Sequence, residues 1–236
     1  MQDEIISIKK LKSYISKKYD LEVENSNFFA NGILVHNCQI LRPLLEKYKG
    51  TQFSISEKLD GSSITFFIKD GEFGVCSRNL ELKETEDNTI WKWARKNDIE
   101  NKLRGLNKNI ALQGELIGPG VNGNTLNLTF IDIYFYDAFD IDKFNYYDLN
   151  EFKILLENKL KLKTVPIISY DYWLEDNIDE LIKKATGASI INPKGIREGI
   201  VLRPTNEIYD STVMEDNNGR ITFKVLNPEY CLKYDT

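Results

Sequence analysis

The chain has 236 residues, of which 42% are hydrophobic and 28% are charged, and its formal net charge is −5. This composition fits one good-sized core or a domain with an appendage, and it argues against a broad basic nucleic-acid surface while allowing a local groove. No apolar run approaches the length of a membrane span and the N-terminus lacks a signal-peptide pattern, so we expect a cytoplasmic protein.

The cysteines and the single histidine narrow the chemistry. Cys38, Cys76 and Cys231 are an odd set without a C-x-x-C pair, which indicates neither a disulfide framework nor a structural zinc site. His36 is the only histidine, so residues 38 to 236 cannot hold a histidine-based triad or a multi-histidine metal centre. Lysine and carboxylate chemistry is therefore expected there.

Residues 1 to 37 differ in character from the rest of the chain. Residues 5–8 and 19–24 alternate as short strands, and a loop leads to the string FFANGILVHNC over residues 28–38. In such a string, the side-chain amide of Asn37 can attack its own carbonyl and cut the following peptide bond, while His36 polarises that carbonyl. Cys38 then supplies a thiol nucleophile.

This string resembles the C-terminal end of an intein, up to the splice junction. The resemblance implies that Asp20 is the acidic residue that assists splicing, although Ser26 stands where inteins often carry a second histidine. Because the chain begins at Met1 and the intein-like part spans only residues 1–37, we expect a split-intein fragment that splices in trans with a separately made polypeptide. A truncated precursor and a plain β-hairpin with an exposed His-Asn-Cys turn are the alternatives.

From residue 38 the pattern predicts antiparallel strands with inserted helices, an α+β class. A hairpin turn at 69–72 brings its second strand back, so Arg78 is expected near Lys58. A glycine- and asparagine-rich loop covers 118–127. In chain order, the expected elements are a helix over 41–48, strands over 52–56, 63–68 and 73–79, a helix over 89–103 with Ile90, Trp93, Ala94 and Ile99 on its buried side, strands over 110–118 and 130–140, helices over 150–159 and 177–186, and closing strands over 195–204 and 220–226.

The string EKLDGSS, residues 57–63, carries the candidate nucleophile. A lysine followed by x-Asp-Gly at a strand end suits covalent nucleotidyl transfer, in which the amine attacks the α-phosphorus of a nucleoside triphosphate and keeps the nucleotide. Lys58 must be partly neutral for this, and lysine loses its proton readily when it is desolvated or crowded by cations. Gly61 would let the backbone pass close to the nucleotide.

Charged residues recur on the predicted strands in a fixed order: Lys58, Arg78, Glu115, Glu198 and Lys224. With the strings EKLDGSS, VCSRN, LQGELIGPGVNGN, FYDAFDID, REGIVLRP and FKVLN, the region over about residues 52–234 resembles the covalent nucleotidyltransferase superfamily, and most of all ATP-dependent RNA ligases of the Deinococcus nick-sealing type. The resemblance implies an antiparallel-sheet, ATP-grasp-like adenylation domain over 38–236, preceded by the intein fragment over 1–37.

The resemblance also implies the residues that hold the nucleotide. Lys58 would be the nucleophile, and Glu57 with Asp60 would hold the adenosine and the surroundings of the lysine. Tyr136 would stack on adenine, although a core position is the alternative in a run this aromatic. Glu115 would accept a hydrogen bond from a ribose hydroxyl.

The remaining roles concern phosphate and metal. Arg78 would contact the ribose or the end being joined, since a guanidinium pairs well with phosphate. Glu198 would help to place Mg²⁺ or Mn²⁺, and Lys224 would neutralise the α-phosphate. Many relatives carry a lysine at the position of Thr222, so one phosphate contact is either missing or supplied by Lys233.

The expected activity is ATP-dependent RNA ligation in three steps: adenylation of Lys58, transfer of AMP to a 5′-phosphate, and attack by a 3′-hydroxyl, with nicked duplex RNA as the expected substrate. Relatives generally carry an N-terminal oligonucleotide-binding domain, which we expect on the second polypeptide with the other intein half, to be joined at Cys38. The alternatives are a DNA ligase, a GTP-using capping-type enzyme, and a latent precursor whose only activity before splicing is self-processing.

Overall fold

The computed structural model describes the backbone of residues 5–10, 19–23, 27–30, 33–36, 41–212 and 219–234, and side chains within 43–212 and 219–234. Strand β1 (Ile5–Lys10) pairs antiparallel with β2 (Tyr19–Val23), and β3 (Asn27–Ala30) with β4 (Ile33–His36). The two strands predicted before residue 25 are therefore present. Ser26, Asn37 and Cys38 lie outside the described residues, as do the side chains of Asp20 and His36.

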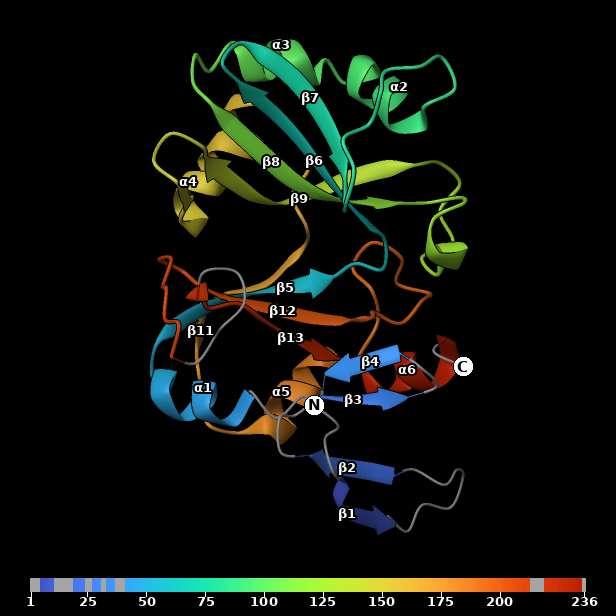
Figure 1. Cartoon of the computed structure of the whole chain (residues 1–236), viewed down its shortest axis with the longest axis vertical. Helices are drawn as coiled ribbons and strands as arrows, with labels where there is room; N and C mark the ends of the chain where they lie inside the picture. The colour runs from blue at the N-terminus through green and yellow to red at the C-terminus, as the bar shows by residue number, and fades with distance from the viewer. Residues whose placement is uncertain are drawn as a thin grey trace.

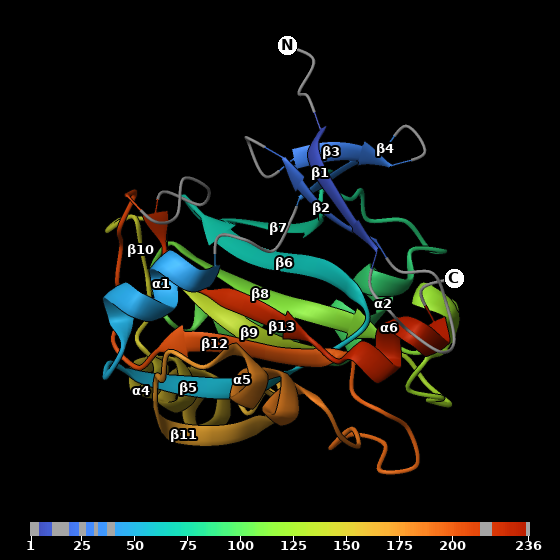
Figure 2. The ribbon, with the colours of Figure 1, turned by 90° about the horizontal axis from the view of Figure 1, so that it is seen from below.

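Two antiparallel sheets form the body of the protein, which confirms the predicted α+β class with antiparallel sheets. In Figure 1 they lie one above the other, with α2 and α3 over the upper sheet and α1 and α5 below the lower one; Figure 2 gives a second view. The strand order of the five-stranded sheet is β10 (Asn145–Tyr146), β9 (Asp132–Asp140), β8 (Ile110–Ile117), β6 (Ser62–Lys69) and β7 (Glu72–Ser77). The strand order of the four-stranded sheet is β11 (Ile167–Trp173), β5 (Gln52–Lys58), β12 (Gly199–Pro204) and β13 (Phe223–Leu226).

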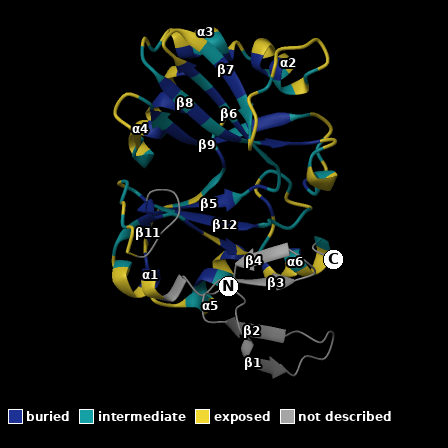
Figure 3. Cartoon of the chain, in the orientation of Figure 1, coloured by how far each residue is buried: buried dark blue, intermediate teal, exposed yellow. Residues whose placement is uncertain are grey.

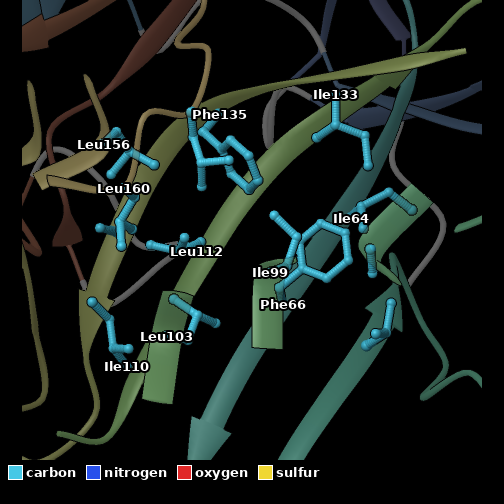
Figure 4. Packing of buried hydrophobic residues seen from close by; sticks show 14 of the residues in the cluster. Ile64, Phe66, Ile99, Leu103, Ile110, Leu112, Ile133, Phe135, Leu156 and Leu160 are labelled. Carbon is cyan, nitrogen blue, oxygen red and sulfur yellow. The ribbon is translucent and has the colours of Figure 1, made fainter. Parts of the chain in front are cut away.

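Each sheet buries one face against helices. Successive side chains of a strand point to opposite faces, and in β6 the buried positions are Ile64, Phe66 and Ile68. They pack with residues of β8 and β9 and of the helices α2 (Thr89–Lys96), α3 (Ile99–Arg104) and α4 (Leu149–Lys153). Figure 4 shows part of this core, with Ile64 and Phe66 of β6 beside Ile99 of α3 and Phe135 of β9. A second core packs the four-stranded sheet against α1 (Leu41–Tyr48) and α5 (Ile178–Ala185). In Figure 3 both sheets are largely buried and the outer helix surfaces are exposed.

The predicted helix over 89–103 is two helices. Asp98 has φ 55°, in the left-handed region, so the chain breaks between α2 and α3. Asn88 caps α2 by accepting hydrogen bonds from the backbone of Ile90 and Trp91. The buried residues of this segment include Trp91, Ala94 and Ile99, whereas Ile90 and Trp93 are only partly buried.

Strand β11, helix α6 (Pro228–Tyr234) and the short strand β10 were not predicted, and the helix expected over 150–159 differs from the observed one. Strand β11 was missed because it is an edge strand with two register shifts, so the alternation of its exposure slips by one residue within the strand. The helix expected over 150–159 begins as α4 and continues as the π-helical turn η3 (Ile154–Lys159). No helix in the described part of the chain is both long and apolar enough to cross a membrane.

Candidate active site

A cavity of about 600 Å³ lies between the two sheets. Strand alternation explains its lining: the even positions of β5 and the odd positions of β8 face away from the two cores. The cavity therefore has a polar and charged wall between two apolar cores. The residues that line it include Glu57, Lys58, Ser63, Arg78, Gln113, Glu115, Tyr136, Asp137, Arg203, Arg220, Thr222 and Lys224.

Lys58 is the last residue of β5, directly opposite Gly199 of β12. This register brings Glu198 beside it, and Lys58 Nζ donates a hydrogen bond to Glu198 Oε1 within an ion pair. The other oxygen, Glu198 Oε2, is buried and has no hydrogen-bond partner among the residues that the structure describes. The ion pair therefore leaves one acceptor of Glu198 unused.

Burial and mutual charge shift the pKa values of this cluster. Desolvation raises the pKa of Glu115 to about 7, with Lys58 opposing the shift and Glu198 adding to it. Desolvation also raises the pKa of Glu198, against the pull of Lys58. Loss of hydration and the nearby charge of Lys58 lower the pKa of Lys224. Lys58, Glu115 and Lys224 line the cavity, and Glu198 joins this cluster through its ion pair with Lys58.

Asp60 and Gly61 fix the turn after Lys58 against neighbouring segments. Asp60 Oδ2 accepts hydrogen bonds from Thr125 Oγ1 at 2.7 Å and from Tyr230 Oη at 2.5 Å. Asn122 Nδ2 donates to Asp60 Oδ1 at 3.2 Å and to the carbonyl of Gly61 at 2.6 Å. Asn122 belongs to the glycine- and asparagine-rich loop, in the 3-10 turn η2 (Asn122–Asn124). The Asp60 carboxylate is therefore held by protein donors.

Glu57 is 1% exposed, and its Oε2 accepts a hydrogen bond from the backbone N–H of Ile190 at 2.8 Å. Burial raises the pKa of its carboxyl, and hydrogen bonds from the Ser189 side chain and the backbone of Ile190, with the charge of Arg197, oppose that shift. Its second oxygen, Oε1, is buried and has no hydrogen-bond partner within the described part of the chain. Glu57 thus keeps one acceptor beside the cavity.

Tyr136 forms part of the wall. Its hydroxyl lies 2.8 Å from Ser63 Oγ, and the guanidinium carbon of Arg203 lies 5.4 Å from its ring centroid. The ring also packs against a small cluster of Leu59, Ile117, Leu126 and Val165. Tyr136 therefore lines the cavity and contributes to packing. Arg78 follows β7, is exposed, and also lines the cavity.

Sequence reasoning missed a buried arginine network at the cavity wall. Arg220 pairs with Asp137 through two hydrogen bonds of 2.9 and 2.8 Å, and with Glu207 through bonds of 2.7 and 2.6 Å. Arg203 donates to the carbonyl of Tyr136 at 2.7 Å. Arg203 could have been found from the string REGIVLRP, because Arg203 lies two residues after the cavity-lining Val201 on the same strand. The sequence around Arg220 carries no comparable signal.

The cation beside Thr222 is Arg203. The register of β12 and β13 pairs Leu202 with Phe223, so Arg203 comes opposite Thr222, and both line the cavity. Lys233 lies in α6 with its ammonium 4.8 Å from the ring centroid of Tyr234, and it is not among the lining residues. The alternative that Lys233 supplies a contact here is therefore not supported.

The carboxylates fit a weakly held divalent cation. Among the described residues, no three His, Cys, Asp or Glu side chains gather closely enough to hold a metal ion. Mg²⁺ in nucleotide sites usually binds one or two carboxylates, substrate phosphates and several waters. The unpartnered Glu198 Oε2 suits that kind of site.

Comparisons with known proteins agree with this geometry. A family model described as RNA ligase matches residues 51–226. A lysine-to-alanine variant of Naegleria gruberi RNA ligase with ATP and Mn matches with a TM-score of 0.73 and 36% identity, over 83% of this chain and 55% of that one. The same organism's RNA ligase with PPi matches with a TM-score of 0.73 and 34% identity, over 99% and 61%.

A further variant of that ligase, with AMP and Mn, matches with a TM-score of 0.74 and 33% identity, over 99% of this chain and 62% of that one. The chain thus spans 55 to 62% of the length of these solved structures. No curated protein matches the sequence.

Proposed function

Because the chain belongs to the RNA ligase family, we propose that it joins RNA ends with ATP through a covalent lysyl-AMP intermediate on Lys58. The observation that carries this proposal is the cavity between the sheets, where Lys58 is paired with Glu198 and shares the wall with Glu115, Arg78 and Lys224. The Naegleria structures are with ATP, AMP or PPi; ATP and PPi are the substrate and product of lysine adenylation, and AMP is released when the ends are joined.

In the first step, Lys58 Nζ forms a bond to the α-phosphorus while the bond from that phosphorus to the bridging oxygen of pyrophosphate breaks. Pyrophosphate leaves with the electron pair of the broken bond. The amine gives up one proton before the attack, and Glu198 Oε1 already accepts a hydrogen bond from it. A second proton leaves for solvent as the phosphoramidate forms. Lys224 and Arg203, cations of the same wall, balance charge on the phosphates.

The adenosine is held by acceptors and a ring. The free Glu57 Oε1 can accept from the amino group of adenine, which guanine lacks at that ring position. Tyr136 offers a ring face, and Glu115 an acceptor for a ribose hydroxyl. Mg²⁺ or Mn²⁺ bound at Glu198 Oε2 would supply positive charge at the phosphates.

In the later steps AMP passes to the 5′-phosphate of one RNA end, and the 3′-hydroxyl of the other end displaces AMP. Arg78 is an exposed cation among the residues that line the cavity and would hold the 5′-phosphate. With three cysteines and no C-x-x-C pair, the chain suits a reducing compartment such as the cytoplasm.

A sealing assay tests this function. We expect the chain to join a nicked RNA duplex in the presence of ATP and Mg²⁺, and the Lys58→Ala variant to be inactive. Sealing of a DNA nick but not of an RNA nick would instead support a DNA ligase. Use of GTP with no use of ATP would favour a capping-type enzyme and contradict the role of Glu57.

We also propose that residues 1–37 are the C-terminal part of an intein, with Asn37 as the cyclising residue, His36 as its partner and Cys38 as the accepting nucleophile. The support is the sequence up to the junction, together with a β3–β4 hairpin that ends at His36. The partner would be a separate polypeptide with the N-terminal intein half and an oligonucleotide-binding domain. Mixing the chain with such a fragment should give a ligated product without residues 1–37. A mixture that yields neither ligation nor cleavage, with both chains folded, would contradict the intein assignment.

A further inference from the structure

Helix α6 contacts the segment that carries Lys58, although it lies beyond residue 226, where the RNA ligase family match ends. Tyr230, in the middle of this helix, is 4% exposed. Its hydroxyl donates to Asp60 Oδ2 at 2.5 Å, two residues after the nucleophile. A contact between residues 170 positions apart thus joins the C-terminal helix to the Lys-x-Asp-Gly turn.

The start of α6 is anchored at the other partner of Lys58. Asn227 is fully buried, its N–H donates to the carbonyl of Glu198 at 2.9 Å, and its Nδ2 donates to the carbonyl of Arg197 at 3.0 Å. Asn227 Oδ1 accepts from the N–H of Glu229 at 3.0 Å, which caps the first turn of the helix. One short helix therefore contacts the backbone beside Glu198 and the side chain of Asp60.

We propose that Tyr230 is a positioning residue for the adenylation of Lys58. Its hydrogen bond to Asp60 holds the Lys-x-Asp-Gly turn against α6, while Asn227, before the first residue of α6, holds the backbone at Glu198. Together these contacts set the distance between the turn and Glu198. This inference rests on the proposed ligase function. Asn227 and Tyr230 lie outside the matched family range, so their positioning role is assigned from this chain's own contacts.

The contacts of the Tyr230 hydroxyl link it to the position of Lys58 and so to the rate of adenylation. A hydrogen bond to a carboxylate is shorter and stronger than one between neutral groups. Leu59, between Lys58 and Asp60, is buried and packs in the small cluster beside the cavity, so a shift of Asp60 is transmitted to the lysine. Misplacement of a reacting group by about 1 Å can cost roughly a hundredfold in rate. Desolvation and Asp60 raise the pKa of Tyr230, so it remains a donor at neutral pH.

The test is the single-turnover rate of lysyl-AMP formation in the full chain with ATP and Mg²⁺. Tyr230→Phe removes only the hydroxyl. We expect its rate at saturating ATP to fall roughly tenfold or more, with the ATP concentration for half-maximal rate unchanged. Tyr234→Phe is the matched control, because Tyr234 contacts the ring of Tyr230 and its own hydroxyl makes no hydrogen bond among the described residues. Its rate should equal that of the wild type.

A double-mutant cycle separates positioning from general loosening. If Tyr230 acts through Asp60, the Asp60→Asn and Tyr230→Phe effects are not additive, and the double variant is no slower than the slower single variant. Additive effects, a Tyr230→Phe rate within twofold of wild type, or a change only in the half-saturating ATP concentration would overturn the proposal.

Two further comparisons distinguish a folding defect from a loss of adenylation. If Tyr230→Phe melts below the assay temperature, wild type and variant are compared at a lower temperature at which both are folded. A Tyr230→Phe chain that keeps the wild-type rate there would overturn the proposal. A folded wild-type chain that gains no AMP would refute the proposed function itself, and this inference with it. A wild-type chain that gains AMP while Tyr230→Phe matches its rate would refute only the positioning role.

Discussion

Glu115 is a cavity residue whose ionisation depends on the fold. It lies on the cavity face of β8, and burial raises its pKa to about 7 from a reference value of 4.5. A carboxyl with a raised folded-state pKa stabilises the fold below its unfolded pKa. This contribution is lost as the pH rises through the folded value. Stability should therefore decline between about pH 4.5 and 7 on account of this residue.

The Glu115→Gln variant should remove this pH dependence in the nucleotide-free chain with a chelator present. One pKa unit corresponds to about 1.4 kcal/mol. Because Glu115 is partly accessible to solvent, we expect its pKa shift to change the free energy of unfolding by on the order of 1 to 2 kcal/mol. We expect urea unfolding to show the variant gaining that much free energy of unfolding, relative to wild type, between pH 5 and pH 8. A difference between the two chains that does not change with pH would contradict the raised pKa.

Among single residues, the family resemblance pointed to Glu115 and Lys224, which the structure places on the cavity faces of β8 and β13. Side chains two apart on a strand point the same way, so a position on the strand fixes the face. Arg220 and Tyr230 could not be predicted, because their partners Asp137 and Asp60 are far away in the chain. Only the folded topology brings such pairs together.

The turn between β5 and β6 shows how an element is fixed by close packing. A Cβ on Gly61 would lie 2.3 Å from the carbonyl oxygen of Leu116 and 2.8 Å from Cγ2 of Ile117. Both atoms belong to β8, so the turn can approach that strand only with glycine at this position.

Gly61→Ala should therefore push the turn away from β8. We expect a loss of roughly 1 to 3 kcal/mol in the free energy of unfolding and loss of Lys58 adenylation. Gly105→Ala is the control, because Gly105 has φ −61° and its Cβ would meet no atom closer than 3.4 Å. Its stability should change by less than about 0.5 kcal/mol, or rise slightly. If both variants unfold at the same urea concentration as wild type, the close approach at Gly61 is wrong.

Elements with a clear period were predicted best. Helix α1 has the predicted bounds, and β5, β6 and β8 lie within two residues of theirs. The break at Asp98 was missed because a left-handed residue inside a helical pattern leaves little trace in residue types. Strand β11 was missed because an edge strand need bury neither face fully.

The two sheets are joined by the Arg220 network. Arg220 is 2% exposed and precedes β13 of the four-stranded sheet, whereas its partner Asp137 belongs to β9 of the five-stranded sheet. Removing one partner of a buried ion pair leaves an uncompensated charge. The Arg220 network therefore helps to set the distance between the two sheets that form the cavity walls.

Arg220→Met should cost roughly 3 to 5 kcal/mol in the free energy of unfolding, measured by urea denaturation at neutral pH. Arg95→Met is the control, because Arg95 pairs with Glu84 and Glu100 at the surface. It should cost less than about 1 kcal/mol. Equal losses for the two variants would show that burial does not govern the Arg220 network.

The central claim concerns the whole molecule: two sheets enclose Lys58 as a nucleophile for AMP. The most direct measurement is the intact mass of the purified chain, with and without ATP and Mg²⁺. The account predicts a gain of one AMP in the wild type and none in Lys58→Ala. A folded wild-type chain that gains no mass, or a Lys58→Ala chain that gains AMP, would contradict it.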